Sequence, residues 1–115
     1  MRQIIPLLFS VVILSSCGDD TDYTVIGSQG TLKAIAVPTA LVTDRDHYLR
    51  IVARVCPSSG LCILSFFVGL SSVSYPLSDI ALTAQTAQYN RNPNSGLNRL
   101  LLACRLEDFS PDDCF

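Results

Sequence analysis

The chain has 115 residues, of which eight are lysine or arginine and ten are aspartate or glutamate, so its formal net charge is −2. This length suits one small domain and excludes two. The mildly negative charge argues against a general nucleic-acid-binding protein, which needs a basic face. We therefore expect a single domain without a nucleic-acid partner.

The first sixteen residues have the three parts of an export signal. Arg2 supplies a positive charge, Ile4 to Leu14 form a short apolar run, and Ser15 and Ser16 are small residues of the kind that precede a cleavage site. A helix that spans a membrane needs about 20 apolar residues, and this run is shorter. Pro6 also disfavours a helix near the start of the run. The pattern thus predicts a removable signal and not a retained transmembrane helix.

Leu14-Ser15-Ser16-Cys17 resembles the lipobox of bacterial lipoproteins. The resemblance implies that residues 1–16 are a lipoprotein signal peptide, that Cys17 carries lipid, and that the polar residues 17–22 form a lipidated tether. The alternatives are an ordinary signal peptide with a chance cysteine and a buried N-terminal helix. On the lipoprotein interpretation, the protein is attached to a membrane of the bacterial envelope and faces the periplasm. Gly18, in place of an aspartate, favours the outer membrane, although Asp19 leaves the inner membrane open.

The other four cysteines predict structural disulfides, because an even number is typical of small exported domains. They are Cys56, Cys62, Cys104 and Cys114. Of the three pairings, short loops favour Cys56 with Cys62 and Cys104 with Cys114, and each bond would stabilise the fold by roughly 2–3 kcal/mol. The spacing differs from the Cys-x₂₋₄-Cys pattern of zinc sites and the Cys-x-x-Cys pattern of redox sites. We expect no metal site and no cofactor.

The segment 23–43 is apolar and rich in β-branched residues, with glycines and a proline between them. Within it, Thr31 to Val37 alternates in part and predicts a strand. Pro38 could instead open a helix.

A helix is predicted more clearly after Asp44. Asp44 or Thr43 can cap it, and Cys56 before Pro57 ends it, because a residue before proline avoids the α region. Its apolar side chains recur at helical spacing: Tyr48, Ile51, Val52 and Val55. His47 is the only histidine of the chain and lies in the first turn. We expect a solvated side chain there without a catalytic role.

The residues 62–68 predict a strand in the centre of a sheet, since they are apolar on both faces. The Cys56–Cys62 bond would join the end of the preceding helix to the start of this strand. Ser78 then caps a second predicted helix, from Asp79 to about Tyr89. Its expected buried stripe contains Ile80, Ala84, Ala87 and Tyr89.

Asn90 to Gly96 has the composition of a turn. For Leu97 to Leu106, propensity favours a helix, whereas the apolar run before Cys104 suits a buried strand. We favour the strand, because a strand–helix–strand unit would place it beside residues 62–68. The acidic tail that follows is held back by Cys114.

A polar cluster around this turn is the main candidate for recognition. It contains Asn90, Arg91, Asn92 and Arg99. Arginine and amide groups together can bind a carboxylate, a sugar or a protein partner. Turn chemistry alone also explains the asparagines, so both interpretations stay open.

From about residue 48 to residue 115, the chain resembles a group of small exported bacterial proteins of unknown function. The resemblance lies in a cysteine-bracketed turn before an aromatic strand, in a polar turn and in a cysteine-containing ending. Its residues are Cys56-Pro57-Ser58-Ser59-Gly60-Leu61-Cys62 followed by Ile63 to Val68, then Gln88-Tyr89-Asn90-Arg91-Asn92, Gly96, Arg99-Leu100-Leu101 and Cys104, and finally Pro111 and Cys114. It implies export and a shared fold, and it carries no activity.

These features predict a small α+β domain over residues 23–115, with two to three strands, two helices and two local disulfides. The predicted function is that of a non-enzymatic envelope lipoprotein that binds or scaffolds another periplasmic component. The alternative is a small periplasmic enzyme or enzyme inhibitor that acts on cell-wall material. Such a protein would have a polar cleft around Arg91, Arg99 or His47.

Overall fold

The computed structural model of the chain describes residues 22–106 and 114–115. The predicted signal peptide, the lipidation site Cys17 and all of the tether except its last residue lie outside these residues, as does the acidic segment 107–113. Within the described part, no helix is long and apolar enough to cross a membrane.

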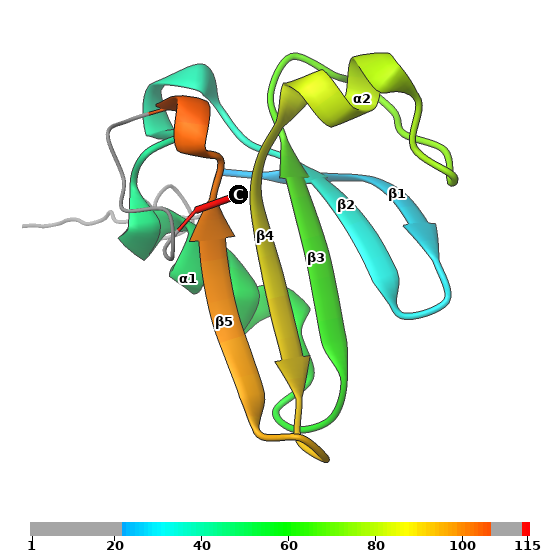
Figure 1. Ribbon diagram of the computed structural model, residues 1–115, viewed down its shortest axis with the longest axis vertical. Coiled ribbons are helices and arrows are strands. Elements are labelled where there is room, and N and C mark those ends of the chain that lie inside the picture. The colour runs from blue at the N-terminus through cyan, green and yellow to red at the C-terminus, as the bar shows by residue number, and fades with distance from the viewer. Residues whose placement is uncertain (1–21, 107–113) are drawn as a thin grey trace, which may run out of the picture.

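One mixed sheet of five strands organises the described residues (Figure 1). The strands are β1 (Thr24–Gln29), β2 (Leu32–Ala36), β3 (Cys62–Phe67), β4 (Gln85–Asn92) and β5 (Leu97–Leu102). Their order in the sheet follows the chain, and neighbouring strands are antiparallel except β2 and β3, which are parallel. Our expectation of two to three strands was therefore wrong. The predictions of a central strand beginning at Cys62 and of a strand beginning at Leu97 are confirmed.

The largest error concerns the second helix. Helix α2 (Asp79–Ala84) begins after Ser78, whose Oγ accepts a hydrogen bond from the Ala81 backbone at 3.1 Å as a cap should, but it ends six residues later. The residues predicted to continue it form β4, together with the first residues of the predicted turn. Alanine and glutamine favour helix in isolation. Here pairing on both sides, with β3 and with β5, overrides that preference.

The other unpredicted strand is β1, which forms a hairpin with β2. The chain reverses at Gly30, whose φ of 61° suits glycine. A bulge between Val25 and Gly27 shifts the register of the hairpin, and this shift breaks the alternation of side chains by which a strand is recognised in sequence.

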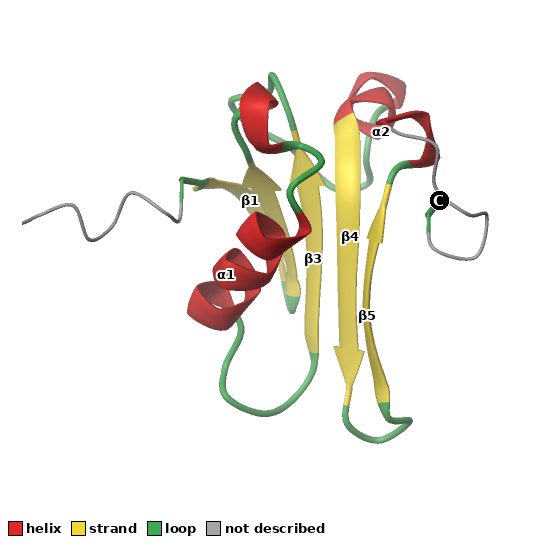
Figure 2. Cartoon of the chain, turned by 90° about the vertical axis from the view of Figure 1, so that its left-hand side faces the viewer, coloured by secondary structure: helices red, strands yellow, loops and turns green. Residues whose placement is uncertain are grey.

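Helix α1 (Arg45–Val55) connects the parallel strands β2 and β3 and lies on one side of the sheet (Figure 2). The predicted cap is confirmed, since the Asp44 carboxylate accepts a hydrogen bond from the His47 backbone at 3.1 Å. The short 3-10 helix η2 (Thr39–Leu41) precedes it.

The main core lies between α1 and the sheet. Tyr48, Ile51 and Val52 of α1 share one buried cluster with residues of β2 to β5, among them Phe66 and Leu100. The rings of Tyr48 and Phe66 meet edge to face, with centroids 4.9 Å apart.

A smaller cluster covers part of the opposite face. The segment after β3 crosses this face, and its Leu70, Val73 and Tyr75 pack against a cluster that contains Phe67. The Val73 backbone donates to the Ile26 carbonyl oxygen at 3.0 Å. A Cβ on Gly27 would lie 2.4 Å from the Val73 carbonyl oxygen, so the close approach of this segment requires glycine there.

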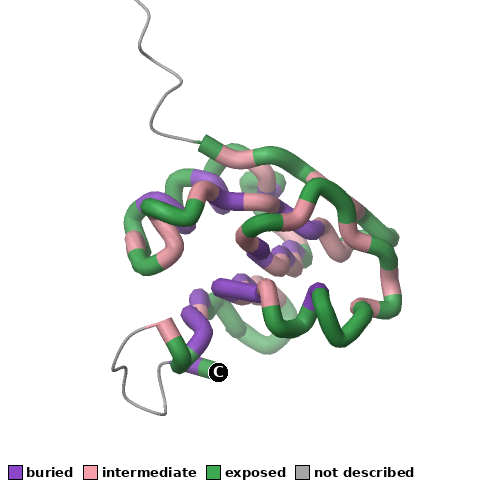
Figure 3. The backbone as a smooth tube through the Cα atoms, turned by 90° about the horizontal axis from the view of Figure 1, so that it is seen from above, coloured by how far each residue is buried: buried purple, intermediate pink, exposed green. Residues whose placement is uncertain are grey.

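Two disulfides join Cys56 to Cys62 and Cys104 to Cys114 in the described part, which is the pairing that spacing favoured. The second bond holds the C-terminal residues against the end of β5. There the Phe115 backbone N–H donates a hydrogen bond to the Leu102 carbonyl oxygen at 3.0 Å. The short 3-10 helix η3 (Cys104–Leu106) follows β5 in the chain. In Figure 3, buried parts of the chain, coloured purple, lie beside the C-terminus.

Candidate functional site

The candidate site is the side of β3, β4 and β5 that faces away from α1. Successive side chains of a strand point to opposite faces, so each residue next to a core position on these strands belongs to this side. We call it the open sheet face and define it by Ser65, Gln88, Asn90, Arg99 and Leu101. These residues are half-buried or exposed, whereas their neighbours Leu64, Tyr89 and Leu100 are buried under α1.

The strand register brings the polar groups of this face together. Ser65 lies opposite Gln88, and Gln88 lies opposite Leu101. One step along, Asn90 lies opposite Arg99. Directly opposed residues of an antiparallel pair have Cβ atoms about 4.5–5.5 Å apart, so a single ligand can contact both. Two amides, a hydroxyl and a guanidinium therefore share one shallow surface on regular strands.

Arg91, a member of the predicted cluster, points to the other side of the sheet. Its Nε donates to the Gly60 carbonyl oxygen at 3.0 Å and its Nη2 to the Pro57 carbonyl oxygen at 2.5 Å. Both acceptors belong to the loop between α1 and β3, which the Cys56–Cys62 bond also closes. Arg91 is thus a structural residue that fastens this loop to β4.

Asn92 is also explained by structure. Its Oδ1 accepts a hydrogen bond from the Asn94 backbone at 3.0 Å, which is the local bond of an Asx turn. Alternation places Asn90, Asn92 and Arg99 on the same side of the sheet, but the side chain of Asn92 is engaged in its turn, so Asn90 and Arg99 are the predicted residues that remain as candidates.

Sequence reasoning missed Gln88 and Ser65. Gln88 was assigned to a helix, and Ser65 was treated as one residue of an apolar run. A signal for Gln88 was present, because the polar Gln88 and Asn90 alternate with the apolar Ala87 and Tyr89, as in a strand with one buried face.

We expected the side chain of His47 to be solvated, and this prediction was wrong. His47 is buried, with 1% of its surface exposed. Its Nε2 has no hydrogen-bond partner among the described residues. The Asp44 carboxylate, three residues before it in sequence, accepts from the backbone of His47. This carboxylate therefore serves as the helix cap. The described residues contain no group of three His, Cys, Asp or Glu side chains placed to hold a metal ion.

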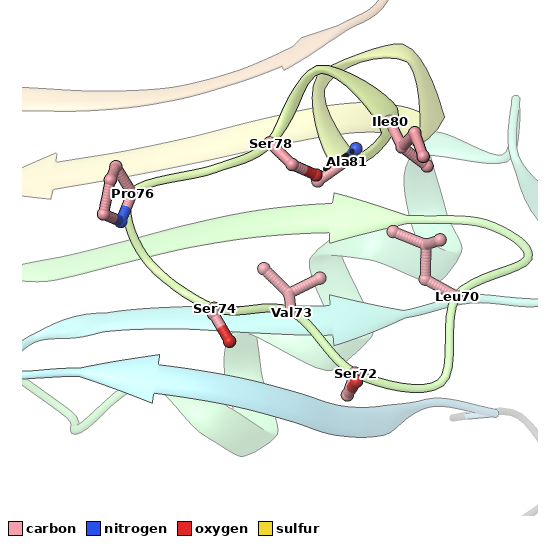
Figure 4. A pocket seen from close by; sticks show the side chains of 8 residues that line it. All are labelled: Leu70, Ser72, Val73, Ser74, Pro76, Ser78, Ile80 and Ala81. Carbon is pink, nitrogen blue, oxygen red and sulfur yellow. Dashed lines mark hydrogen bonds between the residues drawn. The ribbon is translucent and has the colours of Figure 1, made fainter.

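A pocket of about 280 Å³ lies between α2 and the segment that follows β3 (Figure 4). Its lining is apolar and hydroxyl-bearing: Leu70, Ser72, Val73, Ser74, Pro76, Ser78, Ile80 and Ala81. Leu70 and Val73 point toward α2 in Figure 4. This lining contains no ionisable side chain, so the pocket offers contact surface and hydrogen bonds but no acid or base.

Tyr75 belongs to the segment that follows β3 and lies beside Ser65 of the open sheet face. Burial raises the pKa of Tyr75, and the Ser65 hydroxyl offsets part of that rise. Its own hydroxyl is buried without a well-formed hydrogen bond to any described group. The phenol is therefore neutral at physiological pH and forms an apolar border beside Ser65.

A second pocket, of about 310 Å³, lies where β1 begins. Its lining is Asp22, Tyr23, Thr24, Ala36, Val37 and Pro38.

No protein-family model matches the chain, and no curated protein or solved structure matches it significantly. The geometry of the open sheet face therefore carries the functional interpretation. Its groups can donate and accept hydrogen bonds, and the guanidinium of Arg99 can pair with a carboxylate.

Proposed function

We propose that this protein is a non-enzymatic, lipid-anchored protein of the bacterial cell envelope that binds a periplasmic protein through the open sheet face. The observation that carries the proposal is the contrast between the two sides of β3 to β5. One side is buried beneath α1, whereas the other presents amide and guanidinium groups that are only half-buried or exposed.

The composition of this face suits a protein partner. The polar groups of Gln88, Asn90 and Arg99 lie beside the apolar side chains of Leu101 and Leu97, and Leu97 is 45% exposed. Protein interfaces combine apolar contact with roughly one hydrogen bond per 100–200 Å² and are enriched in arginine. We expect the partner to present hydrogen-bonding groups to the side-chain amides of Gln88 and Asn90.

The anchoring part of the proposal rests on the export signal and the lipobox-like tetrapeptide that ends at Cys17. The other four cysteines are consumed by two disulfides, so Cys17 is left as the cysteine with a separate role. Disulfides are typical of exported proteins, which agrees with an envelope location.

Mass spectrometry of the N-terminal peptide tests the anchor. From bacterial membranes we expect a peptide that begins at Cys17 and carries acyl chains. The C17S variant should lack this mass and should leave the membrane fraction. An unmodified N-terminus at Met1 in the wild-type chain would contradict the proposal.

Photo-cross-linking in intact cells tests the binding surface. A photoreactive amino acid at position 88 lies on the open sheet face, and the same group at position 54 lies on the exposed side of α1. We expect a discrete protein adduct from position 88 and none of that mass from position 54. Equal adducts from both positions, or none from position 88, would contradict the proposed surface.

A further inference from the structure

The first strand of the domain begins at the same end of the sheet at which α2 lies (Figure 1). Thr24 at the start of β1 pairs with Ala36, and Ala36 pairs with Phe67. Phe67 in turn pairs with Gln85, which directly follows α2. The register thus fixes the entry of the chain into the domain and α2 at one common end.

The chain between the predicted lipid anchor and the domain is short. Six peptide steps lead from Cys17 to Tyr23, and a fully extended chain spans about 3.3–3.6 Å per residue, so the two lie at most about 20 Å apart. Tyr23 packs against the main core, so its position within the domain is fixed. Neighbouring strands are about 4.8 Å apart, which places the starts of β1 and β4 about 15 Å from each other. A lipid at Cys17 therefore keeps the α2 end within about 35 Å of the bilayer.

The surface at this end is apolar at α2. Ile80 is 73% exposed and Leu82 is 50% exposed, on either side of the buried Ala81. Among the described residues, no other large apolar side chain is as exposed as Ile80. Ile80 also borders the pocket that contains Leu70 and Val73, so the apolar surface extends from the helix into the following hollow (Figure 4).

We infer that the α2 end of the domain rests on the lipid surface, with Ile80 in contact with the outer part of the acyl chains. Leu82 points about 200° away around the helix and therefore makes less contact with lipid. The inference rests on the proposed lipid anchor. In this orientation the hairpin between β4 and β5 points away from the membrane, and the open sheet face stands upright, accessible to a periplasmic protein. Helix α2 carries one charge, Asp79 in its first turn, which would lie among the headgroups.

The absence of tryptophan from the sequence allows a direct test. Three variants of the full chain each receive one tryptophan: I80W and L82W at α2, and the matched control L97W, an exposed leucine at the opposite end of the sheet. Each is expressed with its signal, purified from membranes and reconstituted into phosphatidylcholine–phosphatidylglycerol vesicles with or without brominated acyl chains, which quench tryptophan on contact.

Because tryptophan settles at lipid interfaces within reach of the acyl chains, we expect about twofold quenching for I80W, weaker quenching for L82W and none for L97W. Equal quenching at all three positions would overturn the inference. So would unquenched I80W and L82W in a chain that still floats with the vesicles, and in that case the lipid anchor stands. A chain that does not float with the vesicles overturns the anchor and the inference together.

Discussion

Arg99 and Leu100 are neighbours in β5, yet Leu100 is 5% exposed beneath α1 and Arg99 is exposed on the opposite side. The same division runs through Ser65 and Phe66 of β3, and through Tyr89 and Asn90 of β4. Alternation along a strand separates two roles at a distance of one residue. On one side the residues stabilise the fold, and the other side carries the surface that we propose for a protein partner.

The tyrosines of the two sides show the same contrast. The Tyr48 hydroxyl is hydrogen-bonded to the Val42 carbonyl oxygen at 2.7 Å and to the Thr86 hydroxyl at 2.9 Å. The Tyr75 hydroxyl is buried without such partners among the described groups. A fully satisfied polar group specifies one packing, whereas an unsatisfied one destabilises the state that buries it. The contrast concerns the two tyrosines only, because the buried His47 Nε2 of α1 also lacks a hydrogen-bond partner among the described residues.

The largest effect should come from F66A, paired with S65A. Phe66 is fully buried against Tyr48, so its truncation should lower the free energy of unfolding by about 3–5 kcal/mol. S65A, one residue away on the open sheet face, should change it by less than about 0.5 kcal/mol. Urea titration followed by circular dichroism measures both values. Similar losses in the two variants would show that both sides stabilise the fold equally.

Removal of either disulfide should have the next largest effect. The Cys56–Cys62 bond closes the loop between α1 and β3, and the double variant C56S/C62S should lose about 2 kcal/mol of stability on the chain-entropy account. C104S/C114S opens a somewhat longer loop and should lose slightly more, about 3 kcal/mol or less. Unchanged urea midpoints for both double variants would refute the stabilising role of the disulfides.

Y48F and Y75F compare the two tyrosines. Y48F should cost about 1–2 kcal/mol, because the groups that bonded the hydroxyl remain buried. Y75F should cost less than about 0.5 kcal/mol or stabilise slightly, since the buried Tyr75 hydroxyl makes no well-formed hydrogen bond to a described group. Thermal unfolding ranks the two variants, and the reverse order would contradict the contrast drawn above.

A smaller effect is expected at alkaline pH. Burial raises the pKa of Tyr48 above 10.0; the Thr86 hydroxyl opposes this rise and the Asp44 carboxylate adds to it. The folded state then binds more protons than the unfolded state, so the stability is present below pH 10.0 and is lost as the pH rises through the folded pKa. Urea midpoints between pH 9 and pH 11 should fall less steeply for Y48F than for the wild-type chain. Parallel curves would contradict this assignment.

Local signals in the sequence were enough to predict α1, both disulfides and β3. The cap at Asp44, the helical spacing of Tyr48, Ile51 and Val52, and the short cysteine loops all act within a few residues. By contrast, β1 and β4 depend on partners that are distant in sequence. In β4 that pairing reversed the helical preference of the Ala- and Gln-rich run, and in β1 a bulge hid the alternation.

The candidate site was predicted in part, for the same reason. Asn90 and Arg99 were grouped because both lie near one turn, and the hairpin does place them opposite each other. Arg91 was grouped with them by proximity in sequence, but alternation moves it to the other side of the sheet, where it holds the loop at Pro57 and Gly60. Once β4 was taken for a helix, the face could not be assembled from the sequence.

The N90A/R99A double variant tests the division of roles most directly, by two readouts on one protein. Both side chains lie on the open sheet face, so the free energy of unfolding should change by less than about 1 kcal/mol. The adduct from the photoreactive group at position 88 should fall at least about fivefold, since truncation of an arginine at an interface often costs more than about 1 kcal/mol of binding free energy. An unchanged adduct, or a loss of stability as large as that of F66A, would contradict the assignment of this face to a partner.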